Sequence, residues 1–331
     1  MTVCLGCLKE KKLKNSYCTK CIKNVFDGVV PLPLDFGKKE FYVQRNELAP
    51  RMSMSGVQDK ISLKFEKNKL VTTAINGRYI LKPIPTSSHI KNESDVVYNE
   101  HLSMLISQEI FKINTAKCAL IQFNDGEMAY ITKRFDYEDE TGLKYDQEDF
   151  ASILDVSSAS HGANYKYEAK TYLDCANAIK MNVPASVITL EDFFKRILLN
   201  YLISNGDAHL KNFSLYSLAN KNDYVLTPNY DILNTRYHVN EMYGDMALDF
   251  MDEFTKSYEV VGYYTYADFY QFAQYLNIKD IRFEKIMNLI NSSEERIIEM
   301  VNSSFLSDNA KKYYINSYSD RLKRLNYKIK L

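Results

Sequence analysis

The sequence predicts an α+β fold with a small β-rich lobe, a larger helical lobe and a short cysteine-bearing module in front of both. Short alternating apolar runs between residues 61 and 133 are typical of strands. Apolar residues at helical spacing dominate after residue 147. Two CxxC pairs fall within the first 21 residues. We therefore expect a module over residues 1–28, a β-rich lobe over 29–135 and a helical lobe over 136–331.

The composition indicates a folded protein of the cytoplasm. The chain has 331 residues, which is long enough for two lobes that each bury a core. Its 42 basic and 42 acidic side chains cancel, so no overall field favours nucleic acid. The sequence contains no apolar run of about 18 residues, and its N-terminus lacks the pattern of a signal peptide. We expect reduced thiols and no membrane contact.

The four cysteines of the N-terminal module are Cys4, Cys7, Cys18 and Cys21. Each CxxC pair can present two thiolates to one tetrahedral ion, and the doubled spacing favours a structural Zn²⁺. Four free cysteines, or a redox pair, are the alternatives. The bound metal would supply folding energy to this module. We interpret the module as a structural brace or a docking surface for a partner, in preference to a nucleic-acid-binding element.

The β-rich lobe is predicted from short apolar runs on either side of one helical pattern. We expect strands at 61–65, 79–82, 120–123 and 128–133, with a helix at 94–111. Further helices are expected at 147–155, 166–182, 189–204, 264–277, 280–303 and 308–327.

The helix expected at 189–204 leads directly into a cluster of polar residues. Its apolar side chains recur at the spacing of one buried face and stop at Asn205-Gly206, a helix-stop signal. Asp207, His209 and Asn212 follow within a few residues. A buried helix that ends in such a cluster is a common way to hold catalytic groups still.

Residues elsewhere complete a pattern found in phosphoryl transferases. Lys82 lies on a predicted strand and Glu100 on the next helix, as in the ion pair that positions a lysine on the α- and β-phosphates in protein kinases. Asp207 and Asn212 have the spacing of a kinase catalytic base and its metal-binding asparagine. Asp231 is a second acid, and such oxygen ligands suit Mg²⁺.

A loop before the first strand of the β-rich lobe completes the expected phosphate site. Residues 53–60 contain Ser55 and Gly56, and a small loop of this kind can lay backbone N–H groups against phosphates.

One family pattern matches, in order, Ser53–Lys60, Ile80–Pro83, Asn99–Glu100, Lys133–Asp136, Gln147–Phe150, Asn205–Asn212 and Tyr230–Asp231. In these segments the sequence resembles the HipA-like serine/threonine kinases, which are toxins of bacterial HipBA-type toxin–antitoxin pairs. The chain before the phosphate loop is short, and the loop carries both Ser53 and Ser55. Both features are similar to HipT, the kinase of tripartite HipBST systems. The cysteine module departs from the family pattern.

The resemblance implies a two-lobed protein-kinase-like fold and an ATP- and Mg²⁺-dependent serine/threonine protein kinase. Its substrate would be a translation component such as an aminoacyl-tRNA synthetase. Its partners would be antitoxin proteins of the HipB or HipS type, and DNA would be contacted only through an antitoxin. Autophosphorylation of Ser53 or Ser55 would silence the enzyme, because the added charge would lie against the triphosphate.

The resemblance also implies roles for individual residues. The catalytic residues would be Asp207, His209 and Asn212, and the Mg²⁺ ligands Asn212 and Asp231. The nucleotide-binding residues would be Lys82, Glu100, Lys133, Phe135, Gln147, Ser55 and Gly56, with Lys133 to Phe135 as the adenine-binding hinge.

Two other functions remain compatible with the sequence. One is a kinase-fold binding or regulatory module that docks a partner through its zinc site. The other is a kinase whose substrate is not a protein. Every catalytic position named above is occupied by a suitable residue, which favours an active enzyme over a purely binding module.

Overall fold

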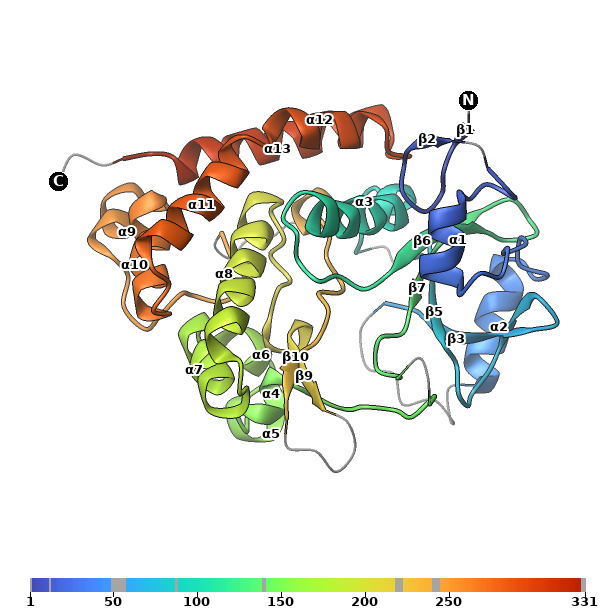
Figure 1. The fold of residues 1–331 in the computed structure, drawn as a ribbon, viewed down its shortest axis with the longest axis horizontal. Helices are drawn as coiled ribbons and strands as arrows, with labels where there is room; N and C mark the ends of the chain where they lie inside the picture. The colour runs from blue at the N-terminus through green and yellow to red at the C-terminus, as the bar shows by residue number, and fades with distance from the viewer. Residues whose placement is uncertain are drawn as a thin grey trace.

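A computed structural model describes residues 2–11, 13–48, 58–86, 89–138, 141–217, 223–239 and 245–328. Ser53, Ser55 and Gly56 of the predicted phosphate loop lie outside these residues. The chain has the α+β architecture that the sequence predicts, with a sheet-containing part next to a helical part (Figure 1).

The sheet-containing part is built on five antiparallel strands in the order β4-β3-β5-β7-β6. These are β3 (Ile61–Glu66), β4 (Lys69–Thr72), β5 (Tyr79–Pro83), β6 (Cys118–Gln122) and β7 (Met128–Lys133). Lys82 of β5 pairs with Tyr130 of β7, and the next pair along is Leu81 with Ile131. Since side chains alternate along a strand, these two pairs belong to opposite faces of the sheet.

Each face of the sheet packs against different helices. Leu81 and Ile131 share a core with Phe26 of α1 (Thr19–Phe26) and Phe41 of α2 (Lys38–Leu48). Tyr130 shares the larger core with α3 (Val96–Glu109) and the helical part. Residues 2–28, which we call the cysteine segment, also contain β1 (Thr2–Val3) and β2 (Glu10–Lys11). The cysteine segment therefore shares its core with the sheet.

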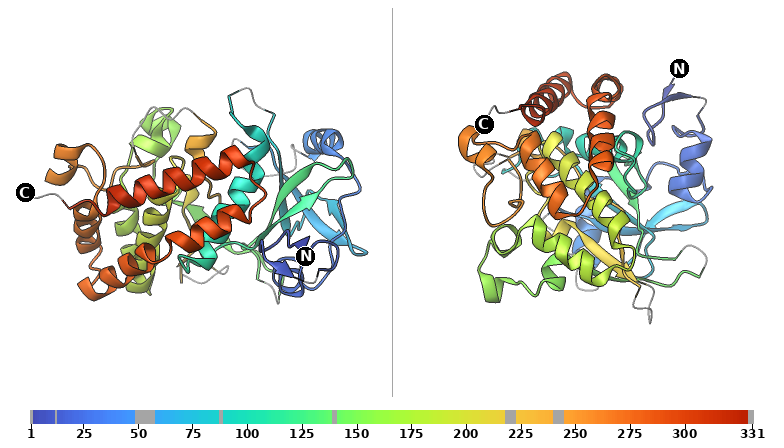
Figure 2. Two further views of the ribbon diagram at one scale, coloured as in Figure 1. Left: turned by 90° about the horizontal axis from the view of Figure 1, so that it is seen from above. Right: turned by 60° about the vertical axis from the view of Figure 1, so that its left-hand side comes forward.

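The helical part also contains a small three-stranded antiparallel sheet, whose yellow strands lie at the edge of the helices in Figure 2. Its α-helices are α4 (Phe150–Ile153), α5 (Ser158–His161), α6 (Tyr165–Glu168), α7 (Tyr172–Asn182), α8 (Ser186–Leu202), α9 (Lys256–Val261), α10 (Tyr266–Tyr275), α11 (Asp280–Asn291), α12 (Glu294–Asn302) and α13 (Asp308–Leu325). The strands are β8 (Asp146–Asp149), β9 (Ser214–Ser217) and β10 (Val225–Leu226), and the short 3-10 helices of this part are η3 (Leu210–Asn212) and η4 (Thr235–Tyr237). A further short 3-10 helix, η2 (Glu93–Asp95), directly precedes α3. Among the helices described, none has both the length and the apolar character that a bilayer crossing requires.

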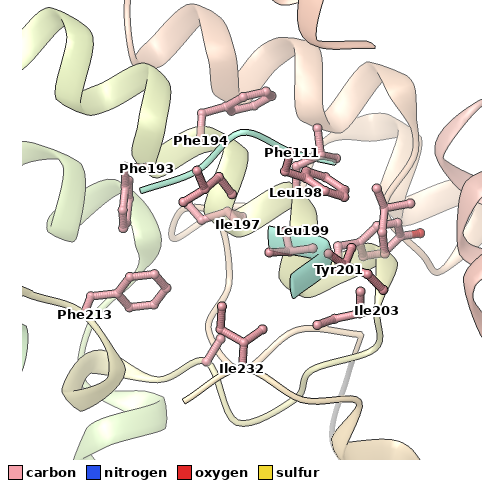
Figure 3. Packing of buried hydrophobic residues seen from close by; sticks show 14 of the residues in the cluster. Phe111, Phe193, Phe194, Ile197, Leu198, Leu199, Tyr201, Ile203, Phe213 and Ile232 are labelled. Carbon is pink, nitrogen blue, oxygen red and sulfur yellow. The ribbon is translucent and has the colours of Figure 1, made fainter. Parts of the chain in front are cut away.

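Helix α8 is the centre of the helical part. Phe193, Ile197 and Leu198 are fully buried, as the apolar spacing predicts. Figure 3 shows that Phe213 and Ile232 pack in the same apolar region as this helix. These two residues directly follow Asn212 and Asp231 in the chain. The core therefore anchors the backbone beside both polar residues.

Three of the predicted helices were wrong in part. The helix expected at 166–182 is divided into α6 and α7, and Thr171 is the N-cap of α7. Residues 146–149 form strand β8, which pairs with β9, and α4 begins only at Phe150 with Asp149 as its N-cap. The long helix expected at 280–303 is interrupted at Ser292 and Ser293, which separate α11 from α12. In all three places short serine, threonine or aspartate side chains, which compete for backbone hydrogen bonds, favour a boundary.

Leu198→Ala tests the role of the α8 core. Because Leu198 is fully buried, we expect the free energy of unfolding to fall by about 3 kcal/mol in urea titrations. Ile188 lies on the same helix with 78% of its surface exposed, so Ile188→Ala should change the value by less than about 0.5 kcal/mol. Equal losses in the two variants would contradict this packing.

Candidate active site

Lys82 lies between two carboxylates that come from different parts of the fold. Its Nζ is 2.7 Å from Glu100 Oε1 on α3 and 2.6 Å from Asp231 Oδ1 on the loop after β10. The side chains of Lys82 and Glu100 are 7% and 1% exposed, whereas that of Asp231 is 37% exposed. The structure thus brings together the lysine and glutamate that the sequence pairs, and adds the second acid.

The burial of these charges shifts their pKa values. Burial raises the pKa of Glu100 to about 7, although the ammonium of Lys82 acts in the opposite direction. Burial alone would lower the pKa of Lys82, but Asp231 and Glu100 more than offset it and raise that pKa. Burial alone would likewise raise the pKa of Asp231, and Lys82 more than offsets it, so the pKa of Asp231 is lowered.

Lys60 is a further cation at this site to which the sequence analysis assigned no role. It is the last residue of the loop motif at 53–60. Burial, followed by the nearby charge of Lys82, lowers the pKa of Lys60, and Asp231 and Glu100 act on it in the opposite direction. Its place in the quoted loop motif was the signal that could have identified it.

The chain enters the polar cluster through a left-handed turn. Ser204 has a φ of 58° and follows directly after α8 and its C-cap. The left-handed residue after the helix is therefore Ser204, one residue before the predicted stop at Asn205-Gly206, and it is not a glycine. Asp231 also has a φ of 58°. Backbone strain of this kind often accompanies functional positions, and here it occurs beside the cluster and at the acid itself.

Hydrogen bonds fix the loop that carries Asp207. The Gly206 N–H donates to Thr235 Oγ1 at 2.8 Å, and the Asp207 N–H donates to Asn205 Oδ1 at 3.2 Å. Asn212 Nδ2 donates to the Asp207 carbonyl at 2.7 Å. That bond uses the amide nitrogen of Asn212, and an amide oxygen is a ligand that Mg²⁺ accepts.

The carboxylate of Asp207 is 47% exposed and has two aromatic neighbours. The Tyr167 hydroxyl donates a short hydrogen bond to Asp207 Oδ1, and His209 Nε2 is 3.7 Å from the same oxygen. The Lys211 N–H donates to His209 Nδ1, so a neutral imidazole carries its proton on Nε2, facing Asp207. Burial lowers the pKa of His209, partly opposed by Asp207.

Tyr167 is a site residue that the sequence analysis missed. It lies on the short helix α6, and its ring packs edge-on against that of His209 at 4.9 Å between centroids. Nothing in its local sequence marks it, because the contact with Asp207 joins residues 40 positions apart.

Three other predicted nucleotide-binding residues, Phe135, Lys133 and Gln147, lie in different surroundings. The Phe135 ring packs 5.4 Å from that of Tyr230, the residue before Asp231. Lys133 instead directs its ammonium to Asp27, with Nζ 2.7 Å from Oδ1. Gln147 is exposed on β8, where its backbone pairs with Tyr216.

The four cysteines form a compact cluster that fits a metal ion. The sulfur atoms of Cys4, Cys7, Cys18 and Cys21 all lie within 4.8 Å of one another, and the thiols are free. The backbone N–H groups of Gly6 and Cys18 donate to Cys4 Sγ at 3.4 and 3.2 Å. Four thiols with N–H···S support are the ligand set of structural zinc sites.

Lys82→Met tests the electrostatics around Glu100. Without the ammonium, the pKa of Glu100 should rise further above its value in the folded wild-type protein. A carboxyl whose pKa is raised by folding stabilises the fold below its ordinary pKa of 4.5, and that contribution is lost as the pH rises through the folded pKa. We expect the variant to lose about 3 kcal/mol of unfolding free energy near pH 8 and less near pH 5.

The control for this experiment is the double variant Lys82→Met/Glu100→Gln. An amide does not titrate, so the double variant should lose a similar amount of unfolding free energy near pH 5 and near pH 8 in urea titrations. A loss in Lys82→Met that is the same at both pH values would contradict the pKa assigned to Glu100.

Comparison with solved structures gives the fold class. HipA of Shewanella oneidensis, solved with HipB and its operator DNA, matches with a TM-score of 0.61 at 20% identity, over 87% of this chain and 70% of that one. The Helicobacter pylori proinflammatory kinase CtkA matches with a TM-score of 0.51 at 14% identity, over 80% of this chain and 90% of its own. The predicted two-lobed, protein-kinase-like fold is therefore confirmed.

Comparison of sequences gives the family. A Haemophilus influenzae protein described as "Putative kinase" is 25% identical over 335 residues, which span 96% of this chain and 95% of that protein. The HipA-like C-terminal domain family matches residues 52–303, which is most of the chain. The chain therefore belongs to the HipA-like kinase family.

Proposed function

We propose that this HipA-like kinase transfers phosphate from Mg²⁺-bound ATP to serine or threonine residues of a protein. The observation that carries the proposal is the position of Lys82. Its ammonium is held by Glu100 of the sheet-containing lobe and meets Asp231 of the helical lobe, 2.6 Å away. A cation fixed between the lobes, beside a metal-binding acid, is what phosphoryl transfer requires.

The residues around Lys82 fit a nucleotide with its metal. Asp231 and Asn212 offer the carboxylate and amide oxygens that Mg²⁺ prefers. The metal would neutralise charge on the β- and γ-phosphates. In this proposal Lys82 binds phosphate oxygens while Glu100 keeps the ammonium in place. The backbone from Lys133 to Phe135 holds the adenine, and Gln147 lies close to the nucleotide.

Asp207 is the proposed base for the substrate hydroxyl. Its half-exposed carboxylate can be reached by a protein side chain, and its charge would accept the proton as the hydroxyl attacks. Tyr167 and His209 both approach Oδ1, which supports a fixed orientation of the carboxylate. In the proposal, His209 also lies beside the γ-phosphate.

The proposed biological role is that of a toxin in a toxin–antitoxin system. Membership of the HipA-like family supports this role, and the solved Shewanella HipA is bound to HipB and operator DNA. The proposed substrate is a translation component such as an aminoacyl-tRNA synthetase, and the proposed partners are antitoxins of the HipB or HipS type. Autophosphorylation at Ser53 or Ser55 is part of the proposal, although both serines lie outside the described residues.

A structural Zn²⁺ in the cysteine cluster completes the proposal. The four sulfur atoms are close enough to share one ion, and the N–H groups that support Cys4 favour its thiolate form.

Asp207→Asn tests the enzymatic proposal. The change removes the base and its charge at nearly constant volume, so transfer of labelled phosphate from ATP, to the chain itself or to a protein acceptor, should fall by about 1000-fold. Unfolding in urea should remain close to wild-type. Asp252→Asn, the same change at an exposed position, should keep full transfer. Normal transfer by Asp207→Asn would refute the assigned role.

Tyr167→Phe tests whether the hydroxyl orients Asp207. The phenyl ring keeps its contact with His209, but the hydrogen bond to Oδ1 is lost. We expect kcat to fall about tenfold while KM for ATP stays unchanged, because the base is misaligned and the nucleotide site is intact. Steady-state kinetics that show an unchanged kcat would exclude this role.

A further inference from the structure

The cysteine segment contacts α3 next to the glutamate that holds Lys82. The carbonyl of Gly6, which lies between Cys4 and Cys7, is 3.3 Å from His101 Nε2. His101 is 1% exposed and directly follows Glu100 in α3. Leu8 packs in the same core as the apolar side of α3. The segment therefore has both a polar and an apolar contact with this helix.

The same segment covers one edge of the five-stranded sheet. Strand β6 is the last strand in the sheet order. The Leu120 N–H of β6 donates to the Leu5 carbonyl at 2.9 Å, and the Tyr17 hydroxyl donates to the Leu120 carbonyl at 2.6 Å. Since α3 also packs on β6 and β7, the segment touches both the helix and the sheet edge against which that helix rests.

A third set of contacts joins the end of the segment to the strands of the nucleotide site. Asp27, the C-cap of α1, accepts a hydrogen bond from the Tyr79 hydroxyl at 3.1 Å. Its other oxygen is 2.7 Å from Lys133 Nζ. Tyr79 begins the strand that carries Lys82, and Lys133 ends β7. The segment thus reaches β5, β7 and α3 together.

The cysteine segment contains strained backbone and wraps closely around its four sulfur atoms. Leu8, Asn15 and Ser16 have φ values of 58°, 44° and 73°, in the left-handed region that non-glycine residues rarely adopt. A Cβ on Gly6 would lie 2.7 Å from Cys21 Sγ, so the chain is wrapped tightly around the sulfur cluster. Its two strands contain only two residues each. A metal bound by the four cysteines would hold this strained loop, which has little regular structure of its own.

We propose that the metal-loaded cysteine segment is the positioning element for Glu100. The ion holds Gly6 and Leu8 against α3, and α3 in turn holds Glu100 on Lys82. Loss of the ion would free the segment, loosen α3 from the edge of the sheet and release the ammonium of Lys82. The expected change in nucleotide affinity rests on the proposed function of the Lys82 site, whereas the expected change in hydrogen exchange of α3 does not.

The direct test uses the intact chain with a chelator that binds Zn²⁺ and leaves Mg²⁺ in solution. Metal analysis of the purified protein should give about one zinc per chain. After removal of the zinc, hydrogen exchange should increase in residues 96–109 of α3 and in β6, and should stay unchanged in residues 186–202 of α8. The affinity for a Mg²⁺-bound fluorescent ATP analogue should fall at least about tenfold and return when zinc is added back.

Single variants test separately the binding of zinc and the contact between Gly6 and His101. Cys21→Ser should lose zinc and weaken nucleotide binding, while Cys175→Ser, at a buried thiol of α7, should keep both. His101→Leu should keep zinc and still weaken nucleotide binding, because the donor to the Gly6 carbonyl is gone. His101→Gln, which retains an N–H donor, should recover part of the affinity. If Cys21→Ser does not fold, chelation of the wild-type chain gives the same information.

The outcomes distinguish this inference from the proposed function. A zinc-loaded chain that binds the nucleotide but transfers no phosphate would refute the kinase proposal and leave the exchange test of α3 intact. A chain that retains no zinc, or a zinc-free chain with unchanged exchange in α3 and unchanged nucleotide affinity, would overturn the inference.

Discussion

The rest of the site depends on the two ion pairs that the buried ammonium of Lys82 makes with Glu100 and Asp231. A charge with only 7% of its side chain exposed requires opposite charges close by, and Glu100 and Asp231 supply them from two lobes. This requirement is met because α3 packs on the sheet and the loop after β10 returns to it. In the proposed function phosphate reaches the same charge from the side of Asp231, which is 37% exposed. The same ion pairs therefore join the two lobes and hold the charge that the proposed reaction uses.

The apolar core fixes the backbone from which the polar groups extend. Ile203, Phe213 and Ile232 are almost fully buried, and each lies close in sequence to a residue of the site (Figure 3). Leu210 is fully buried within the loop that bears Asp207. Because packed side chains leave little freedom, the core and the hydrogen bonds of the loop together hold the polar residues between them. This arrangement allows a half-exposed acid and a strained backbone at Asp231 to persist.

The sequence alone predicted the parts of the site that depend on local pattern. The spacing of Asp207 and Asn212 and the placement of Lys82 on a strand are visible within single elements. The α+β class followed from periodicity. Tyr167 and the contact of Asp27 with Lys133 were not predictable, because they join distant segments through tertiary folding. Strand β8 was mistaken for helix because its pairing partner β9 lies far along the chain. The shared core of the cysteine segment and the sheet likewise depends on packing that no spacing reveals.

We propose that Lys82, Glu100 and Asp231 form a nucleotide site between the lobes. A crystal structure of the chain with Mg²⁺ and a non-hydrolysable ATP analogue tests it most directly. The account predicts phosphate oxygens within hydrogen-bonding distance of Lys82, Glu100 still paired with that lysine, and the metal bound by Asp231 and Asn212. A nucleotide bound elsewhere, or bound at this site without contact to Lys82, would contradict the account.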